Sequence, residues 1–368
     1  MPETRLPLAG LKVVAIEQAV AAPFCSARLA DAGAEVIKIE RPEGDFARGY
    51  DKAAAGQSSY FVWLNRGKTS LTLDLTSPQG KAELETLIAD ADVLIHNLKH
   101  GAMDRLGFST TRLSETYPAL INCAITGYGE TGPMAKRKAY DLLVQAETGL
   151  CSITGGPSEP SRVGLSIVDI ATGAVAYSAI LEALIQRSTT SKGSAISVSM
   201  FDVMAEWLTV PLLNHEAGNS PKRIGMAHPS ISPYGVFATK DQEQILISIQ
   251  SDREWRNLCC DFFGQSELGT DPRFATNVAR VANRQQTDAI VSGRFAELDW
   301  QEATELLTKA DIAFASVNDM ARLSAHPHLR RIKVETPNGP VSLPAPAPVF
   351  AGENRQYGPV PAHKERKE

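Results

Sequence analysis

Apolar and polar positions alternate along the first half of the chain in a way that predicts repeated strand–helix units. Short apolar or period-two segments predict strands at residues 13–16, 36–39, 71–75, 93–95 and 120–125. Helical spacing between them predicts helices over about 23–32 and 77–91, and Ser77 followed by Pro78 is typical of a helix start. We therefore expect an α/β fold with a mostly parallel sheet and helices on both faces.

A longer helix is predicted after Asp169, because apolar residues from Ile170 to Leu184 recur at spacings of three and four. The apolar stretch 164–185 also contains Asp169 and Glu182, which a membrane span would carry at high cost. We interpret it as a buried helix and expect no membrane partner. The short segment 1–10 has no apolar signal sequence.

Proline, serine and glycine become frequent near residues 219–233, which indicates a domain boundary. We predict a large domain formed by residues 1–200 and 325–368, a linker at 201–224 and a smaller α+β domain at 225–324. The chain has 368 residues, enough for two domains and for a large core without disulfides or metals.

The formal net charge is −5, so nucleic acid is not expected as the main partner, although a local basic pocket can still bind a small anion. The five cysteines are scattered without a C-x-x-C pair. That usage predicts a reduced, cytoplasmic protein without a structural zinc site.

Gly127-Tyr-Gly129-Glu-Thr-Gly132 matches the dinucleotide-binding pattern G-x-G-x-x-G. That fingerprint belongs to the first strand–helix turn of such domains, whereas at least four predicted strands precede this one. Pro133 and the basic run 136–138 follow where an apolar helix should begin. We interpret the segment as a glycine-rich loop at the carboxyl edge of the sheet, where a ligand can still bind.

Eight segments, in order along almost the whole chain, resemble the family III CoA-transferases, which include formyl-CoA and carnitine CoA-transferases. They are residues 8–14, 22–23, 33–48, 65–74, 101–107, 125–133, 140–141 and 199–202, of which Gly33-Ala-Glu-Val-Ile-Lys-Ile-Glu-Arg-Pro42 is the most recognisable. The resemblance implies a Rossmann-like large domain built from both chain ends, a small inserted domain, and a homodimer of two interlocked ring-shaped subunits. It also implies a CoA thioester as substrate and no permanently bound cofactor.

Asp169 matches the position of the family's covalent nucleophile, and an enzyme carboxylate can exchange CoA through an anhydride and a thioester. From the residues alone, an aspartate that opens an apolar helix is an N-cap, and we expect the helix end to favour its ionised form. Residues that match family contacts to CoA are Arg41, Leu73, Asp74, Asn97, Leu98, Arg105, Lys138, Tyr140 and Asp141. Taken singly, the basic residues would be solvated surface charges.

Departures from the formyl-CoA enzyme bear on the substrate. Val20 replaces a glutamine near its active site, and segment 227–236 looks more like relatives that use succinyl-CoA and branched dicarboxylates. We therefore expect succinyl-CoA as donor and a C4–C6 dicarboxylate as acceptor, with Arg48 or Arg162 holding its second carboxylate and His228 as a further contact or a structural residue. The usual C-terminal segment is missing, which leaves part of the dimer contact open.

Two other functional classes were weighed. The same fold hosts α-methylacyl-CoA racemases, which carry a Gly-His-Asp motif where this chain has Ala139-Tyr140-Asp141. A tyrosine, with an ordinary pKa near ~10, is a poor general base at neutral pH, so the racemase is the second choice. A catalytically silent binding protein is the third, and the intact Asp169 argues against it.

Overall fold

A computed structural model describes residues 5–363, which form two compact units by their contacts. The first unit contains the described residues up to Cys151, with Arg162–Leu213 and those from Arg330 onward. The second contains Ser152–Ser161 and Asn214–Leu329. The chain therefore leaves the first unit and returns to it. Residues 152–161, which the sequence analysis assigned to the large domain, group with the second unit.

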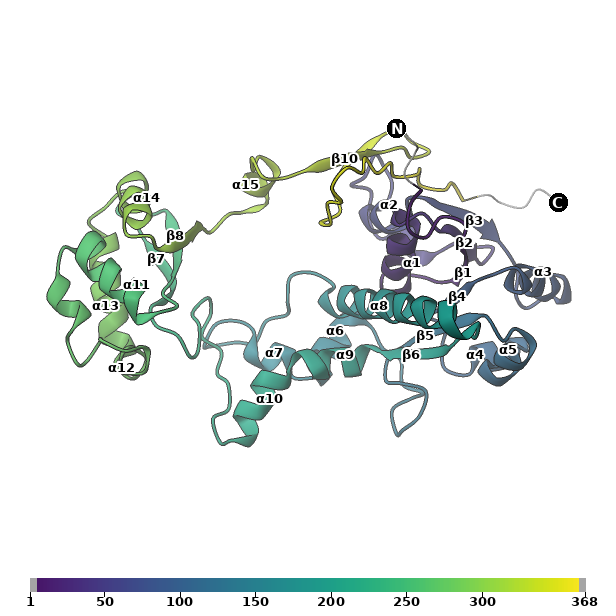
Figure 1. The fold of residues 1–368 in the computed structure, drawn as a ribbon, viewed down its shortest axis with the longest axis horizontal. Helices are drawn as coiled ribbons and strands as arrows, with labels where there is room; N and C mark the ends of the chain where they lie inside the picture. Colours follow the sequence, from purple (N-terminus) through teal and green to yellow (C-terminus); the bar gives the residue numbers. More distant parts are fainter. Residues whose placement is uncertain (1–4, 364–368) are drawn as a thin grey trace. The chain divides into compact units, whose positions relative to one another are not determined.

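The first unit is built on six parallel strands in the order β3-β2-β1-β4-β5-β6 (Figure 1). The strands are β1 (Lys12–Ile16), β2 (Glu35–Glu40), β3 (Lys68–Thr72), β4 (Val93–His96), β5 (Ile121–Thr126) and β6 (Ala195–Ser199). The inner strands are rich in valine and isoleucine because parallel strands covered on both faces are apolar on both. The strand order reverses between β1 and β4, which opens a crevice at the carboxyl edge. The predicted parallel α/β sheet is thus confirmed.

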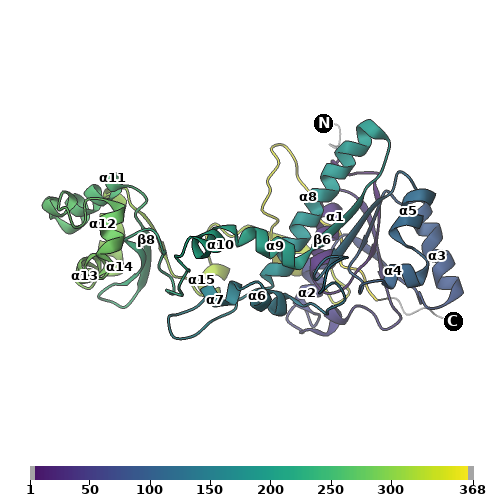
Figure 2. The same cartoon turned by 90° about the horizontal axis from the view of Figure 1, so that it is seen from below.

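Helices cover both faces of this sheet (Figure 2). One face carries α1 (Ala21–Asp31), α8 (Ile167–Thr190) and α9 (Met200–Trp207), and the other carries α3 (Pro78–Ala89), α4 (Ala102–Leu106) and α5 (Thr110–Thr116). Alternate residues of β1 serve the two cores, since Val13 packs with the first group and Val14 with the second. A parallel sheet therefore separates two apolar cores.

The long helix α8 lies in the first of these cores. By length and composition it is apolar enough to cross a membrane, but Val168, Ala176 and Ile180 are buried against α1 and the sheet. Gly173 brings α8 close to α1: a Cβ atom there would lie 2.4 Å from the carbonyl oxygen of Ala21. The beginnings of α8 and α1 are therefore packed side by side.

Two predictions about the third strand and the helix after it had different outcomes. The Ser77 side chain accepts a hydrogen bond from Gly80 N and caps α3, as predicted. The strand β3, however, spans Lys68–Thr72 rather than 71–75. The period-two pattern reflected the burial of Leu73 beyond the paired segment, whereas the paired residues Lys68 and Ser70 are buried polar groups.

The C-terminal part of the chain completes the first unit. The antiparallel pair β10 (Arg331–Val334) and β11 (Val341–Pro344) packs on α2 (Ser59–Asn65). Val334 and Val360 form one small core with Phe61 and Val62 of α2. The remaining elements of the first unit are a 3-10 helix (Phe46–Gly49), α6 (Asp141–Glu147) and α7 (Leu150–Ile153). Helix α7 crosses the boundary between the two units.

The second unit has its own antiparallel sheet in the order β7-β8-β9, formed by Tyr234–Ala238, Gln244–Ser248 and Ala313–Ser316. Its helical segments are α11 (Asp252–Asn257), a π-helix (Leu258–Phe263), a 3-10 helix (Ser266–Gly269), α12 (Asn277–Ala282), α13 (Arg284–Phe295), α14 (Trp300–Lys309) and α15 (Met320–Ser324); α10 (Thr209–Glu216) crosses the boundary. Aromatic residues such as Trp255, Phe262 and Phe295 fill a separate core. The second unit thus has a core of its own.

Candidate active site

Two hydrogen bonds join the loops that follow β1 and β4, at the point where the strand order reverses. Gln18 N donates to Asn97 Oδ1 at 3.0 Å, and Asn97 Nδ2 donates to Gln18 O at 2.8 Å. The Asn97 amide is therefore engaged within the protein and ties the two loops together. Open α/β sheets bind ligands at this switch point, so the carboxyl edge is where a site is expected.

The residues expected to contact CoA all follow the carboxyl end of a strand. Arg41 follows β2; Leu73 and Asp74 follow β3; Asn97, Leu98 and Arg105 follow β4; Lys138, Tyr140 and Asp141 lie between β5 and α6 or at its start. Because these strands are parallel and adjacent, their carboxyl ends share one edge of the sheet. The topology therefore brings all nine positions to the same edge.

Their side chains differ in what they offer there. The side chains of Arg41, Arg105 and Lys138 are exposed and supply positive charge at this edge. Leu73 is 2% exposed and belongs to the core, so its side chain is turned away from solvent. The Asp74 carboxylate accepts hydrogen bonds from the side chain and backbone of Thr76, and these lower its pKa. All three cations can supply positive charge to an anionic ligand, although Arg41 Nε also donates to Gly44 O and lies 3.8 Å from the Glu43 carboxylate.

Asp169 is the third residue of α8, which begins at the carboxyl edge because the helix connects β5 to β6. The interpretation of Asp169 as the N-cap is wrong: the N-cap is Ser166, whose side chain makes no capping bond. Within residues 5–363 the Asp169 carboxylate receives no hydrogen bond and no ion pair. Burial and, after it, the negative charge of Asp141 raise its pKa to about 7. Burial and the charge of Asp141 therefore outweigh the effect of the helix end that was expected to favour the ionised form of Asp169.

Asp141 performs the capping of α8 from a different helix. Its Oδ1 accepts hydrogen bonds from Val168 N at 2.8 Å and from Asp169 N at 3.1 Å. Its Oδ2 accepts a hydrogen bond from Gln145 Nε2 at 2.6 Å, and Gln145 Oε1 accepts one from Val163 N at 2.9 Å. Both oxygens of the Asp141 carboxylate are thus engaged within the protein.

A buried ion cluster lies beneath the loop that joins β1 to α1. The Glu17 carboxylate contacts Lys68 Nζ at 2.6 Å, and Lys38 Nζ contacts Asp45 at 2.8 Å, with all four side chains inaccessible or nearly so. Burial opposes ionisation of Glu17, but Lys68 and Lys38 lower its pKa, and burial lowers the pKa of Lys68 to about 8. Asp45 also accepts a hydrogen bond from the backbone of Ala19, which has a φ of 63°. The cluster therefore fixes this loop at the crevice.

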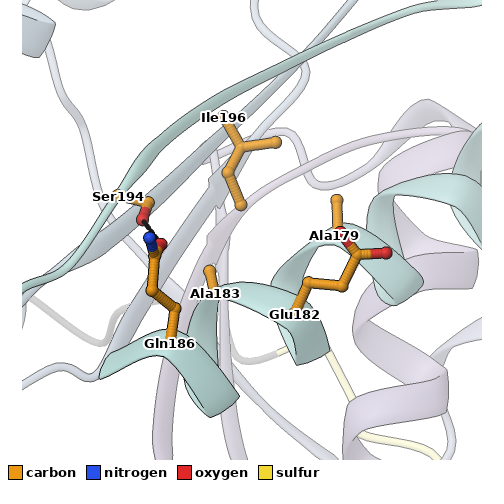
Figure 3. Close-up of a pocket in the computed structure, with 6 residues that line it drawn as sticks. All are labelled: Ala179, Glu182, Ala183, Gln186, Ser194 and Ile196. Atoms are coloured by element: carbon orange, nitrogen blue, oxygen red, sulfur yellow. Dashed lines mark hydrogen bonds between the residues drawn. The ribbon is translucent and has the colours of Figure 1, made fainter. Parts of the chain in front are cut away.

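An open hollow of about 450 Å³ lies elsewhere, between the later turns of α8 and β6 (Figure 3). It is lined by Ala179, Glu182, Ala183, Gln186, Ser194 and Ile196. Ser194 Oγ donates to Gln186 Oε1 at 3.4 Å. Ala179 lies roughly 15 Å beyond Asp169 along the helix. The lining holds a carboxylate and no cation, so the hollow does not suit an anionic nucleotide.

The three residues considered for the acceptor differ in how they are engaged. Arg48 donates to both oxygens of Glu40 and stacks over Phe61 at 3.7 Å, so its guanidinium already has a partner. His228 belongs to the second unit, where it stacks on Tyr234 and accepts a hydrogen bond from Ser230 N. Arg162 is exposed and immediately precedes Val163, which bonds Gln145. Of these three residues, Arg162 is therefore the one whose side chain has no hydrogen bond or ion pair within the described part of the chain.

An aspartate with a raised pKa, at a sheet edge that also carries exposed cations, suits nucleophilic attack or proton transfer on an anionic substrate. The sequence model of CoA-transferase family III matches residues 8–364, nearly the whole chain. The chain belongs to this family. The protein is accordingly a CoA-transferase, which uses CoA thioesters as substrates.

Characterised members of family III are similar over most of their length. A succinate–glutarate CoA-transferase of Agrobacterium fabrum is 35% identical over 370 residues, covering 96% of this chain and 91% of that protein. An acetyl-CoA:oxalate CoA-transferase of Acetobacter aceti is 36% identical over 342 residues, covering 92% and 87%. The crystal structure of a CAIB/BAIF family protein from Brucella suis aligns with a TM-score of 0.83 at 35% identity, over 98% of this chain and 97% of that one. The first two relatives are named CoA-transferases, and the Brucella suis protein has the same fold as this chain.

Three side chains near Asp169 in this family III CoA-transferase were not predicted from the sequence. Tyr60 OH lies 3.3 Å from Ser166 Oγ at the start of α8, and the rings of Tyr50 and Tyr60 meet edge to face at 5.6 Å. Burial, Asp45 and Asp169 raise the pKa of Tyr50 to about 12, so its hydroxyl stays protonated. Gln145 is the third. Both tyrosines lie in the polar segment 43–60, whose spacing predicted no element.

Proposed function

We propose that this enzyme moves CoA from an acyl-CoA to a carboxylic acid with Asp169 as a covalent nucleophile. The observation that carries the proposal is the Asp169 carboxylate, which lies in the first turn of α8 at the carboxyl edge without a hydrogen-bond partner among the described residues. A carboxylate without bonded donors is a stronger nucleophile than a bonded one. The exposed Arg41, Arg105 and Lys138 support binding of the CoA phosphates at the same edge.

The reaction runs through four exchanges. The Asp169 carboxylate attacks the thioester carbonyl of the donor, the C–S bond breaks, and a mixed anhydride and the CoA thiolate form. The thiolate attacks the Asp169 carbonyl carbon, which releases the donor acid as carboxylate and leaves an aspartyl-CoA thioester. The acceptor carboxylate attacks this thioester and releases the thiolate, which then attacks the acceptor's carbonyl in the new anhydride. The product acyl-CoA leaves, and Asp169 returns to its ionised form.

We infer that the donor is succinyl-CoA and the acceptor a C4–C6 dicarboxylate. The relative named for succinate and glutarate supports this choice, as does Val20 in place of the glutamine of the formyl-CoA enzyme. The exposed Arg162 is the cation proposed to bind the second carboxylate. A mass-spectrometric assay with succinyl-CoA and a panel of acids tests this. Faster transfer to oxalate or to monocarboxylates than to every dicarboxylate of that size would refute the choice.

The covalent step has a direct test. Asp169→Ala is expected to lower turnover by several orders of magnitude, and Asp169→Glu to be severely impaired, because an extra methylene displaces the attacking oxygen by about an ångström. Asp202, the exposed third residue of α9, provides the matched control as Asp202→Ala. Intact-protein mass spectrometry after an acid quench should detect the aspartyl-CoA adduct in the unmodified enzyme. More than a few per cent of activity in Asp169→Ala would contradict the mechanism.

We further propose an interlocked homodimer in the cytoplasm, with the first unit as the CoA-binding catalytic domain. The resemblance to the family supports the dimer, and the described cysteines, all unpaired, support a reducing compartment. Light scattering of the purified enzyme measures the dimer's mass directly. A monomer at micromolar concentration would overturn this part of the proposal and leave the chemistry untouched.

A further inference from the structure

Two carboxylates share the N-terminus of α8, and only one of them is bonded to it. The orphan N–H groups of a helix's first turn normally bind the side chain of the helix's own N-cap. Here Ser166 makes no such bond, and Asp141 of α6 accepts from Val168 N and Asp169 N instead. The Asp169 side chain is thereby left without donors from its own helix, while a second negative charge is held beside it.

The position of Asp141 is set by contacts that involve no ligand. Gln145, one turn further along α6, is fully buried and bonds the second oxygen of Asp141 at 2.6 Å. The other end of the Gln145 amide accepts from Val163 N, in the segment that leads into α8. Backbone, amide and carboxylate thus form a continuous chain from Val163 to Asp169. Both oxygens of Asp141 make bonds within the protein, whether or not Asp141 also contacts CoA.

We propose that Asp141 is a positioning residue that fixes the backbone of Asp169 and, through its charge, favours the covalent forms of Asp169 over the free carboxylate. This inference rests on the proposed nucleophilic role of Asp169. The chemical reason is charge balance: when Asp169 becomes an anhydride or a thioester, it turns neutral, and its negative charge leaves with the CoA thiolate or the donor acid. Repulsion from Asp141 is relieved in both intermediates.

Among the described groups around Asp169, only the N-terminus of α8 itself acts against this repulsion. From the segment before α2, Tyr50 faces Asp169 with a hydroxyl that stays protonated because its pKa is raised to about 12. Asp45, which also acts on Tyr50, is paired with buried Lys38. Tyr140 precedes α6 and adds no positive charge. In the described part of the chain, no cation is among the groups that shift the pKa of Asp169.

The test is the equilibrium between free enzyme plus succinyl-CoA and aspartyl-CoA enzyme plus succinate. The full-length enzyme is incubated at a fixed ratio of succinyl-CoA to succinate, quenched in acid and weighed by mass spectrometry. Asp141→Asn keeps the side chain's shape and the oxygen that accepts from Val168 N and Asp169 N. It removes the charge and replaces the acceptor of the Gln145 Nε2 bond by a donor. We expect it to lower the ratio of thioester to free enzyme about tenfold and to move the rising limb of the kcat/KM profile down by roughly one pH unit. The two changes should agree, because both measure the same charge interaction.

The possible outcomes separate the two hypotheses. No adduct in the unmodified enzyme would overturn the nucleophilic role itself. An adduct whose ratio and pH profile are unchanged in Asp141→Asn would overturn only the role of Asp141. A higher KM for succinyl-CoA with an unchanged adduct ratio would make Asp141 a CoA contact instead. If Asp141→Asn does not fold, Asp141→Ser, which also removes the charge, is measured in the same way.

Discussion

Replacing Asp169 by asparagine should stabilise the folded enzyme above neutral pH while abolishing transfer. Burial, followed by the charge of Asp141, raises the pKa of Asp169 from an ordinary 3.8 to about 7. Because the folded-state value lies above the unfolded one, ionised Asp169 opposes folding. The effect is absent below about pH 4, where both states carry the proton, grows between pH 4 and 7, and is complete above that. Asparagine does not ionise, so the variant does not undergo this loss of stability.

The size of the effect follows from the shift. Three pKa units correspond to about 4 kcal/mol, which is an upper bound. Asp169 is partly exposed, and water that reaches the carboxylate weakens both burial and repulsion, so about 1–3 kcal/mol is expected at pH 8. The difference between the two proteins should rise with a slope of up to about 1.4 kcal/mol per pH unit in the titrating range.

Urea unfolding of both proteins at several pH values between 4.5 and 8, at one protein concentration, measures this difference. Asp202→Asn is the control, because Asp202 occupies the same third position of α9 but is exposed. It should lose a little stability, through its favourable interaction with the helix N-terminus, and show no such growth with pH. A difference between Asp169→Asn and the unmodified enzyme that stays constant across the range would refute the reasoning.

Three further predictions concern binding and packing. The basic residues proposed to hold the CoA phosphates are Arg41, Arg105 and Lys138. Neutralising any of them should raise the KM for acyl-CoA more than it lowers kcat, with a smaller effect on an acyl-pantetheine; equal losses with both substrates would exclude a phosphate contact. Gly173→Ala should destabilise the protein by a few kcal/mol, because the new Cβ meets the backbone of α1. Gly293→Ala, in a helix with open space around this position, should stabilise it by about 0.5–1 kcal/mol. Thermal unfolding that ranks the two variants the other way would contradict this packing. Lys68→Met should cost about 3–5 kcal/mol in urea unfolding, since it leaves buried Glu17 without its nearest cation, and a loss under 1 kcal/mol would show that Glu17 is readily neutralised.

Most of the sheet was predictable, because a strand that is buried on both faces is visible in the sequence as a short apolar run. Strands β1, β4 and β5 are mostly apolar and β2 carries Val36, Ile37 and Ile39, and each of the four overlaps a predicted segment. Strand β3 was misplaced by about three residues because its paired residues include Lys68 and Ser70, whose burial depends on Glu17 and Glu40 far away in the sequence. Apolar periodicity cannot report a polar residue that is buried by a partner on another strand.

The site was predictable in its parts but not in its electrostatics. The resemblance to the family singled out Asp169, and its place in the helix start follows from the apolar spacing. That Asp141 rather than Ser166 caps α8 depends on how α6 packs beside it, across about 28 intervening residues. Likewise, Tyr50 and Tyr60 approach α8 only through the tertiary fold. Contacts between residues far apart in the sequence leave no pattern in the local sequence, so they could not be predicted from it.

The route of the chain through the first unit also has a consequence for synthesis on the ribosome. Phe61 and Val62 of α2 are made early, yet the residues that cover them, Val334 and Val360, come almost at the end of the chain. At a synthesis rate of about 5–20 residues per second, the apolar side of α2 stays uncovered for roughly 15–50 s before these residues are made. During that interval the nascent chain carries an unfinished core, which a chaperone would recognise and which a truncated message would leave exposed for good.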